Sequence, residues 1–264
     1  MTVPRAAAVS LDSTSRATDA GFLALADLAQ IATDLAVDYR IVGGHMVTLL
    51  VAAHHASHLV PTRETLDADF GALPQVIADP RLVLALRDLG YAPVGAANRF
   101  VRTLLDPPGP LDLVVDILAP SYVGRLLPNQ RHGDLIVDEV PGLASALARP
   151  PVVVQLTVRL LHGGSVETTL ALPDLVGALC IKALAYRGRY SDKDAVDLWR
   201  LLNAAHVAGI RPGDWPSTIT GQAAATVLWK FFGRTGAAGL RQACRQRSEQ
   251  THLRAIVRAV VPVL

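Results

Sequence analysis

Cysteine and aromatic residues are scarce in this chain of 264 residues. Cys180 and Cys244 lie far apart and lack the CxxC spacing, which argues against a disulfide and indicates reduced thiols in a cytosolic protein. Aromatic residues make up only 5% of the chain, and this favours helices that pack through small side chains.

Long hydrophobic runs are also missing. Residues 1–18 contain no continuous apolar segment, so we expect a flexible N-terminus and no signal peptide. The longest apolar runs, IVGGHMVTLLVAA and AIVRAVVPVL, are too short or too interrupted to span a bilayer. The sequence therefore predicts a soluble, cytoplasmic protein without a membrane partner.

Acidic residues almost disappear from the C-terminal segment. With 51% hydrophobic and 18% charged residues, the chain has the composition of a folded globular protein and a net charge of +2. Residues 221–264 contain one acid, Glu249, and seven basic residues, a net charge of +6. This asymmetry is compatible with a polyanionic partner such as RNA or with a solvated helix surface. The basic residues are Lys230, Arg234, Arg241, Arg245, Arg247, Arg254 and Arg258.

Hydrophobic spacing predicts a change of architecture near residue 173. The expected helices are 21–37, 45–58, 72–90, 172–189 and 191–206, and the expected strands are 39–44, 62–73, two strands within 98–120 joined at DPPGP, and a hairpin over 151–173. We therefore expect an α+β fold: an α/β domain over 19–172, with a mixed sheet flanked by helices, and an all-helical domain over 173–264 with a basic surface.

Two carboxylates share one face of the strand predicted within TRETLDADF. Asp67 and Asp69 are two residues apart, so they project from the same side of a strand. Ionised carboxylates this close repel each other unless a cation lies between them. Oxygen ligands suit Mg²⁺ or Mn²⁺, which also bind the phosphates of a substrate. The pattern therefore indicates a metal site, although a polar strand face is the commoner explanation of such a motif.

Two further features complete this pattern. LDLVVDIL offers Asp112 or Asp116 as a third acid, and we favour Asp116 because it lies in the more apolar stretch. Gly43 and Gly44, between a strand and a helix, allow backbone amides to approach a triphosphate. Together these features describe metal-assisted nucleotidyl transfer from an NTP.

In this order the motifs resemble the DNA polymerase β-like nucleotidyltransferase superfamily. More specifically, RIVGGHMVTLL followed by TRETLDADF is similar to the AbiEii/AbiGii group, which includes the MenT toxins. The R-x-T-x-D-x-D pattern of that group is matched by Arg63, Thr65, Asp67 and Asp69. The later lysine helix and K-D-x-x-D-L helix are matched by Lys182, Arg187, Lys193, Asp194 and Asp197, so the resemblance covers residues 40 to about 202.

The resemblance implies a toxin of a bacterial toxin–antitoxin or phage-defence pair. Members use an NTP to modify the 3′ end of tRNA, so the implied partners are an NTP, RNA and a cognate antitoxin. Asp67, Asp69 and Asp116 would be catalytic metal ligands, and Lys182 and Asp194 would be catalytic. The implied nucleotide-binding residues are Gly43, Gly44, His45, Arg63, Thr65, Lys182 and Arg187.

Several alternatives stay open. His45 replaces the threonine common in the group, which leaves the nucleotide contact at that position undecided. Read alone, Lys182 in LCIKAL favours a side chain that snorkels to the surface. The spacing of His54 and His58 is also that of a zinc site, but a polar helix end is favoured. The alternative functions are a small-molecule nucleotidyltransferase of the aminoglycoside type and a non-catalytic nucleotide-binding protein.

Overall fold

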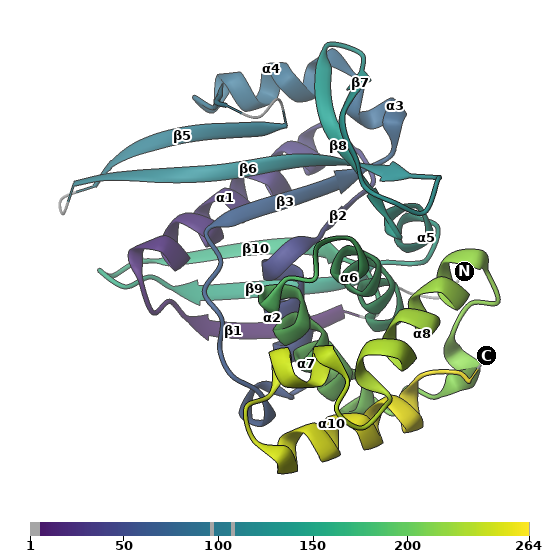
Figure 1. Cartoon of the computed structure of the whole chain (residues 1–264). Coiled ribbons are helices and arrows are strands. Elements are labelled where there is room, and N and C mark those ends of the chain that lie inside the picture. The colour runs from purple at the N-terminus through teal and green to yellow at the C-terminus, as the bar shows by residue number, and fades with distance from the viewer. Residues whose placement is uncertain (1–5, 96–97, 107–108, 264) are drawn as a thin grey trace.

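The computed structural model describes residues 6–95, 98–106 and 109–263, which form two sheets with helices between and beside them (Figure 1). The strands are β1 (Ala6–Asp12), β2 (Tyr39–Ile41), β3 (Asp67–Ala72), β4 (Ala92–Pro93), β5 (Arg99–Asp106), β6 (Gly109–Ser121), β7 (Leu127–His132), β8 (Leu135–Pro141), β9 (Val152–Arg159) and β10 (Ser165–Leu172). The helices are α1 (Arg16–Asp34), α2 (Gly43–Ala53), α3 (Pro74–Ile77), α4 (Pro80–Asp88), α5 (Leu143–Leu147), α6 (Leu175–Arg189), α7 (Asp192–Val207), α8 (Ile219–Phe232), α9 (Ala238–Ala243) and α10 (Arg247–Val260), with short 3-10 turns at Ser57–Leu59 and Pro212–Asp214.

The larger sheet is mixed, in agreement with the predicted α+β class. Its order is β2-β3-β6-β5-β4, with β3 parallel to β6 and β5 antiparallel to it. Strand β5 ends its pairing with β6 at Asp116, and β8 then pairs with β6 from Leu118 onward. Since Leu118 also pairs with Gly71 of β3, β8 continues the sheet on the side that β5 has left. Asp116 lies at this change of neighbour.

The smaller sheet corrects the expectation of a flexible segment over residues 1–18. Within the described part of that segment, β1 pairs in parallel with β9, and β10 completes the order β1-β9-β10. Val9 is 4% exposed and belongs to the hydrophobic core. The strand forms because a segment more than 140 residues away in the chain supplies its hydrogen bonds, and local apolar content could not reveal that partner.

Helix α1 lies between the two sheets and contacts both β6 and β10 (Figure 1). Ser15 caps it by accepting a hydrogen bond from the Thr18 amide. Leu25 and Leu28 are fully buried. Each buried leucine stabilises the fold by about 2 kcal/mol, so this helix joins the sheets into one core.

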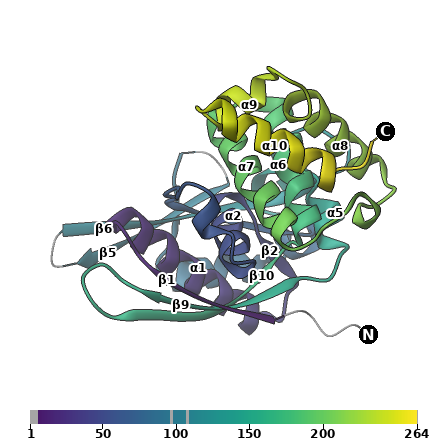
Figure 2. The same cartoon turned by 90° about the horizontal axis from the view of Figure 1, so that it is seen from below.

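From Leu175 to Val263 the described residues contain helices and no strand. These helices gather at one end of the molecule, away from β1 and β9 (Figure 2). Asp174 and Ser191 cap α6 and α7 through their side chains. Of the seven basic residues in 221–264, all except Arg254 are exposed, and Arg254 is half-buried. The hydrophobic core nevertheless runs through both parts, so a separate helical domain stays a prediction.

Several predicted boundaries change. The helix expected over 72–90 is divided into α3 and α4, with Asp79 as the cap of the second and Pro80 at its first position. Helix α2 begins at Gly43, earlier than expected, and ends at Ala53. The predicted 98–120 hairpin is present as β5 and β6, while Pro107 and Pro108 of its turn lie outside the described residues. In the described part of the chain, no helix has the length and apolar character needed to cross a membrane.

The structure predicts that β1 contributes to stability. Replacing Val9 by Ala removes two buried methyl groups and should lower the free energy of unfolding by about 2 kcal/mol, measured by urea denaturation. Ser10→Ala, at the exposed neighbouring position, is the control and should change it by less than about 0.5 kcal/mol. Equal stability of the two variants would contradict the folded role of β1.

Candidate functional site

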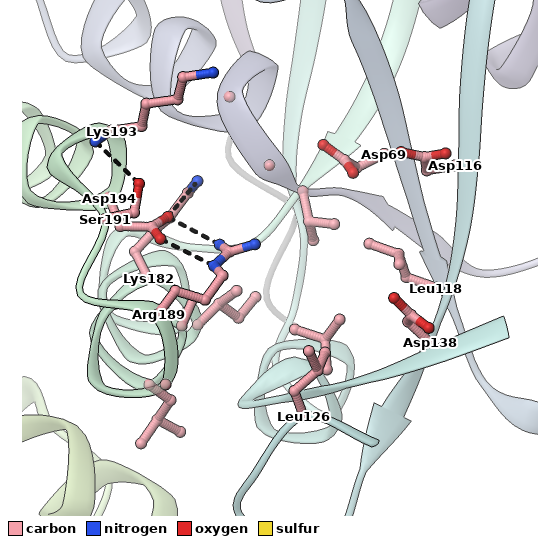
Figure 3. A pocket seen from close by; sticks show the side chains of 18 of the residues that line it. Asp69, Asp116, Leu118, Leu126, Asp138, Lys182, Arg189, Ser191, Lys193 and Asp194 are labelled. Carbon is pink, nitrogen blue, oxygen red and sulfur yellow. Dashed lines mark hydrogen bonds and ion pairs between the residues drawn. The ribbon is translucent and has the colours of Figure 1, made fainter. Parts of the chain in front are cut away.

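A cavity of about 490 Å³ lies between the larger sheet and helices α6 and α7. Acidic residues from the sheet line one side, and Figure 3 shows Asp69 and Asp116 side by side there. Across the cavity, Lys182, Arg189 and Asp194 project from the helical side (Figure 3). The two sides of the cavity thus differ in charge.

The acidic wall, defined as Asp67, Asp69 and Asp116, is a product of strand register. Parallel pairing of β3 with β6 places Asp69 directly opposite Asp116. Ala68 and Phe70, which alternate with the acids on β3, are fully buried, so Asp67 and Asp69 occupy the other face. The expected alternation is present. Asp116 is 8% exposed and lines the cavity, whereas Asp112 is exposed and accepts a hydrogen bond from Thr103.

Burial and neighbouring negative charge both act on the carboxyl group of Asp69. Burial, followed by the nearby Asp116 carboxylate, raises the pKa of Asp69 to about 7, although Lys182 opposes this rise. None of the described residues donates a hydrogen bond to the Asp69 side chain. A cation beside this carboxylate would therefore offset both the cost of burying its negative charge and the repulsion from Asp116.

Gly43 lies directly against Asp69. A Cβ atom at Gly43 would come within 1.7 Å of Asp69 Oδ2, and the backbone φ of +67° also disfavours any larger residue. Gly44 is similarly confined, since its Cβ would lie 2.3 Å from Thr65 Oγ1. Both glycines line the cavity in the first turn of α2, which is capped by no side chain in the described part of the protein. The glycine pair therefore brings uncapped helix amides beside the acidic wall.

Arg99 is a site residue that the sequence motifs did not predict. Its Nε and Nη2 atoms donate to the two oxygens of Asp116 at 2.9 and 2.7 Å, and Nη2 also donates to Asp67 at 2.9 Å. The signal was present in the hairpin register, because Arg99 on β5 pairs with Asp116 on β6. The sequence alone could not reveal this pairing, because the register depends on the length of the β5–β6 turn.

The acidic wall has the donor chemistry of a divalent-metal site but holds an arginine. Three carboxylates on adjacent strands supply the oxygen ligands that Mg²⁺ and Mn²⁺ prefer, and the raised pKa of Asp69 marks a need for positive charge. Within the described ranges, however, the side chains form no group of three or more His, Cys, Asp or Glu residues that could hold a metal ion. Two of the three carboxylates bind Arg99 instead.

Lys182 is buried on the helical side, so the expectation that it snorkels to the surface is wrong. It is 6% exposed, and Nζ donates to Asp197 Oδ2 at 2.7 Å and lies 3.7 Å from Asp194 Oδ1. Asp197 and Asp194 are also buried, at 0% and 3% exposed. They hold the ammonium on the cavity wall, because a buried charge needs such partners.

Asp197 also connects the helical part to the segment that precedes β3. Arg63 Nη1 lies 3.3 Å from each Asp197 oxygen, and Arg200 Nη1 lies 3.9 Å from Oδ1. Arg200 is 3% exposed and donates to Thr48 of α2. Arg63 itself lines the cavity, so Asp197 positions two cationic side chains there, Arg63 and Lys182.

Two arginines lie near the end of α6. Arg189 makes a two-pronged ion pair with Asp194, with distances of 3.1 and 3.0 Å. Arg187 donates to the Gly124 carbonyl oxygen and lines the cavity. These residues add positive charge to the helical side, and guanidinium groups are suited to binding phosphate oxygens.

Thr65 and His45 have different surroundings although both were expected to bind nucleotide. Thr65 lines the cavity, and its buried Oγ1 has no hydrogen-bond partner among the described residues. His45 does not line the cavity; it is 2% exposed and packs against Phe22 and Gly21 of α1. Burial lowers the pKa of His45 to about 4, so its imidazole is neutral.

The remaining candidates are His54 and His58, and Asp138 is a further residue that the sequence motifs did not predict. Helix α2 ends before His54, and His58 lies in a 3-10 turn, so the two do not share a helix face as a zinc site would need. Asp138 was missed because no strand was predicted over 127–141. It pairs in register with Leu118 on β6 and lines the cavity beyond Asp116 (Figure 3).

No protein-family model and no curated protein match the chain. Among solved structures it is similar to an antigenic nucleotidyltransferase-like protein from Paracoccidioides brasiliensis, with 17% identity and a TM-score of 0.48 over 93% of this chain and 95% of that chain. It is also similar to the antibiotic-resistance factor ANT(2'')-Ia, with 12% identity and a TM-score of 0.32 over 90% of each chain. Similarity at this level carries no argument about activity. Membership of the AbiEii/AbiGii group stays a prediction.

The close approach of Gly43 to Asp69 can be tested by mutation. Gly43→Ala should lower the free energy of unfolding by at least about 1 to 2 kcal/mol, because alanine resists a positive φ and its Cβ would also collide with the carboxylate. Gly188→Ala in α6, where a Cβ meets open space, is the matched control and should be neutral or slightly stabilising. Similar effects of the two changes in urea denaturation would contradict this packing.

The pKa of Asp69 predicts a pH dependence of stability. Between about pH 4 and pH 7 the folded protein keeps this proton while the unfolded chain loses it, so the contribution of Asp69 falls as pH rises. Asp69→Asn should therefore stabilise the metal-free protein more at pH 8 than at pH 4, by a few kcal/mol at most. Urea denaturation with a chelator measures this difference, and an equal effect at both pH values would contradict the raised pKa.

Proposed function

We propose that this protein is a metal-dependent nucleotidyltransferase that transfers a nucleotide from an NTP to RNA. The observation that carries the proposal is one cavity with an acidic wall, a glycine-opened helix N-terminus and a row of cationic side chains opposite. Nucleotidyl transfer needs a cation site near the α-phosphate and positive groups along the rest of the triphosphate. The cavity contains candidates for each.

Asp67, Asp69 and Asp116 would hold Mg²⁺ or Mn²⁺, which would supply charge stabilisation at the α-phosphate and activate the attacking hydroxyl. The amides of Gly43 and Gly44 would donate hydrogen bonds to a phosphate at the start of α2, which no side chain of the described residues caps. Thr65 Oγ1, buried and without a partner in the described chain, is available to donate to the same phosphates. These groups fix the position of the nucleotide.

Lys182, Arg63 and Arg187 would bind the triphosphate from the helical side. Lys182 is already desolvated and directed by Asp197 and Asp194, so little side-chain freedom is lost when a phosphate binds. In this arrangement Asp194 acts through the cations that it holds. The nucleotide is then placed between the acidic and the helical walls.

The acceptor in this proposal is RNA, specifically the 3′ end of tRNA. The exposed basic residues of the segment 221–264 support a polyanionic acceptor, because they give this segment a net positive charge and do not line the cavity that would hold the NTP. The resemblance to the AbiEii/AbiGii motifs supports a toxin role in a toxin–antitoxin or phage-defence pair. Transfer to the acceptor end would block aminoacylation and so translation.

Labelled NTPs, Mg²⁺ and total tRNA, incubated with the purified protein, test this activity. We expect label on tRNA with at least one NTP, and about a thousandfold slower transfer with Asp69→Asn, which corresponds to about 4 kcal/mol of transition-state stabilisation. Asp112→Asn removes an exposed carboxylate on the same strand as Asp116 and should leave the rate unchanged. Expression of the wild type, but not of Asp69→Asn, should arrest bacterial growth.

Three outcomes would contradict parts of the proposal. Absence of label transfer with every NTP would count against the enzymatic activity. Transfer to an aminoglycoside in place of tRNA would favour the small-molecule alternative. NTP binding in calorimetry without turnover, unchanged by Asp69→Asn, would favour a non-catalytic binding protein.

A further inference from the structure

Arg99 is the cation that the acidic wall already contains. Its guanidinium is shared between Asp116, which it binds through two hydrogen bonds, and Asp67, which it binds through one. No other side chain of the described residues donates a hydrogen bond to these two carboxylates. Strand pairing fixes the residue in this place, since Arg99 and Asp116 are cross-strand partners.

The guanidinium of Arg99 lies where a divalent ion would bind the acidic wall. Two acids on different strands converge on one positive group, as they would on a bound metal. Arg99 donates to the other two acids, and the side chain of the third acid, Asp69, has no hydrogen-bond donor among the described residues. The cluster is therefore only partly neutralised by the protein itself.

The side chain of Arg99 cannot leave by losing its proton. An arginine guanidinium stays charged throughout the pH range of a folded protein, and Arg99 is held by its hydrogen bonds to Asp116 and Asp67. It can be replaced only by another cation. The side chain is 41% exposed, which leaves it room to move into the cavity.

We propose that Arg99 is a built-in competitor of the divalent cation, holding Asp67 and Asp116 until a metal–nucleotide complex displaces it. This inference rests on the proposed function, because it assumes that the three acids bind a metal. Once displaced, the guanidinium remains on the cavity wall, where the phosphates of the nucleotide offer it a new acceptor. The affinity for the metal ion is therefore low without nucleotide and higher when the nucleotide is bound.

Direct binding of Mn²⁺ without nucleotide or RNA tests the competition, with free Mn²⁺ followed by electron paramagnetic resonance. We expect Arg99→Gln to bind Mn²⁺ at least tenfold more tightly than the wild type. Arg102→Gln is the matched control, because Arg102 lies on the same strand and pairs with Asp27 at 2.9 Å, outside the cavity. Its loss removes the same charge and should leave Mn²⁺ affinity within about twofold of the wild type.

Thermal unfolding supplies a second readout that does not depend on activity. Metal-free Arg99→Gln should unfold at a lower temperature than the wild type, and saturating Mn²⁺ should raise its midpoint more than that of the wild type. Should Arg99→Gln fail to fold, Arg99→Lys keeps the charge but cannot bridge both acids in the same way. We then expect Mn²⁺ binding severalfold tighter than in the wild type.

Equal Mn²⁺ affinity of the wild type and the Arg99 variants would overturn the inference, and so would absence of binding by all of them. An equal gain with Arg102→Gln would also overturn it, since general charge loss would then explain the effect. Each of these results is independent of nucleotide transfer. Transfer activity with unchanged Mn²⁺ affinity would therefore refute the competition while leaving the proposed function intact.

Discussion

Mutual repulsion of carboxylates on two paired strands is the constraint around which the cavity is organised. Parallel pairing of β3 with β6 sets Asp69 opposite Asp116, and burial makes this arrangement costly unless positive charge lies nearby. Arg99 supplies such charge on the sheet, and Lys182 supplies it from across the cavity. Gly43 allows the start of α2 to approach the same carboxylate. The negative charge of the acids therefore explains why cationic side chains and a glycine lie beside them.

The helical part is fixed to this cavity by charge as well as by hydrophobic packing. Asp197 is fully buried and binds Lys182 from α6 and Arg63 from the segment before β3. Removing one partner of such a buried pair leaves an uncompensated charge, which costs about 3 to 5 kcal/mol. The network thus specifies how α6 and α7 meet the sheet. The same contacts that place the helices also direct cations into the cavity.

Much of the fold followed from local patterns. The alternation around Asp67 and Asp69 predicted their shared face, and helical spacing predicted the change of architecture near residue 173. Strand β1 was missed because its partner β9 is distant in sequence. The hairpin of β7 and β8, which carries Asp138, was missed because its residues do not form a strong alternating pattern. His45 packs against α1 and does not line the cavity, and its position after the glycines in the sequence does not show which side of α2 it faces.

By itself, the sequence determined which residue types lie at strand and helix spacing, since these periods belong to the local backbone. It therefore identified Asp67, Asp69 and the glycine pair as candidates, whereas Lys182 was implied only by the resemblance to a known family. Only the tertiary structure decided that Asp116 lines the cavity while Asp112 does not, that Lys182 is buried, and that Arg99 lies between two acids. The physical reason is that charges on segments far apart in the chain meet only through strand pairing and helix packing. The local periodicity of the sequence does not specify which segments pair.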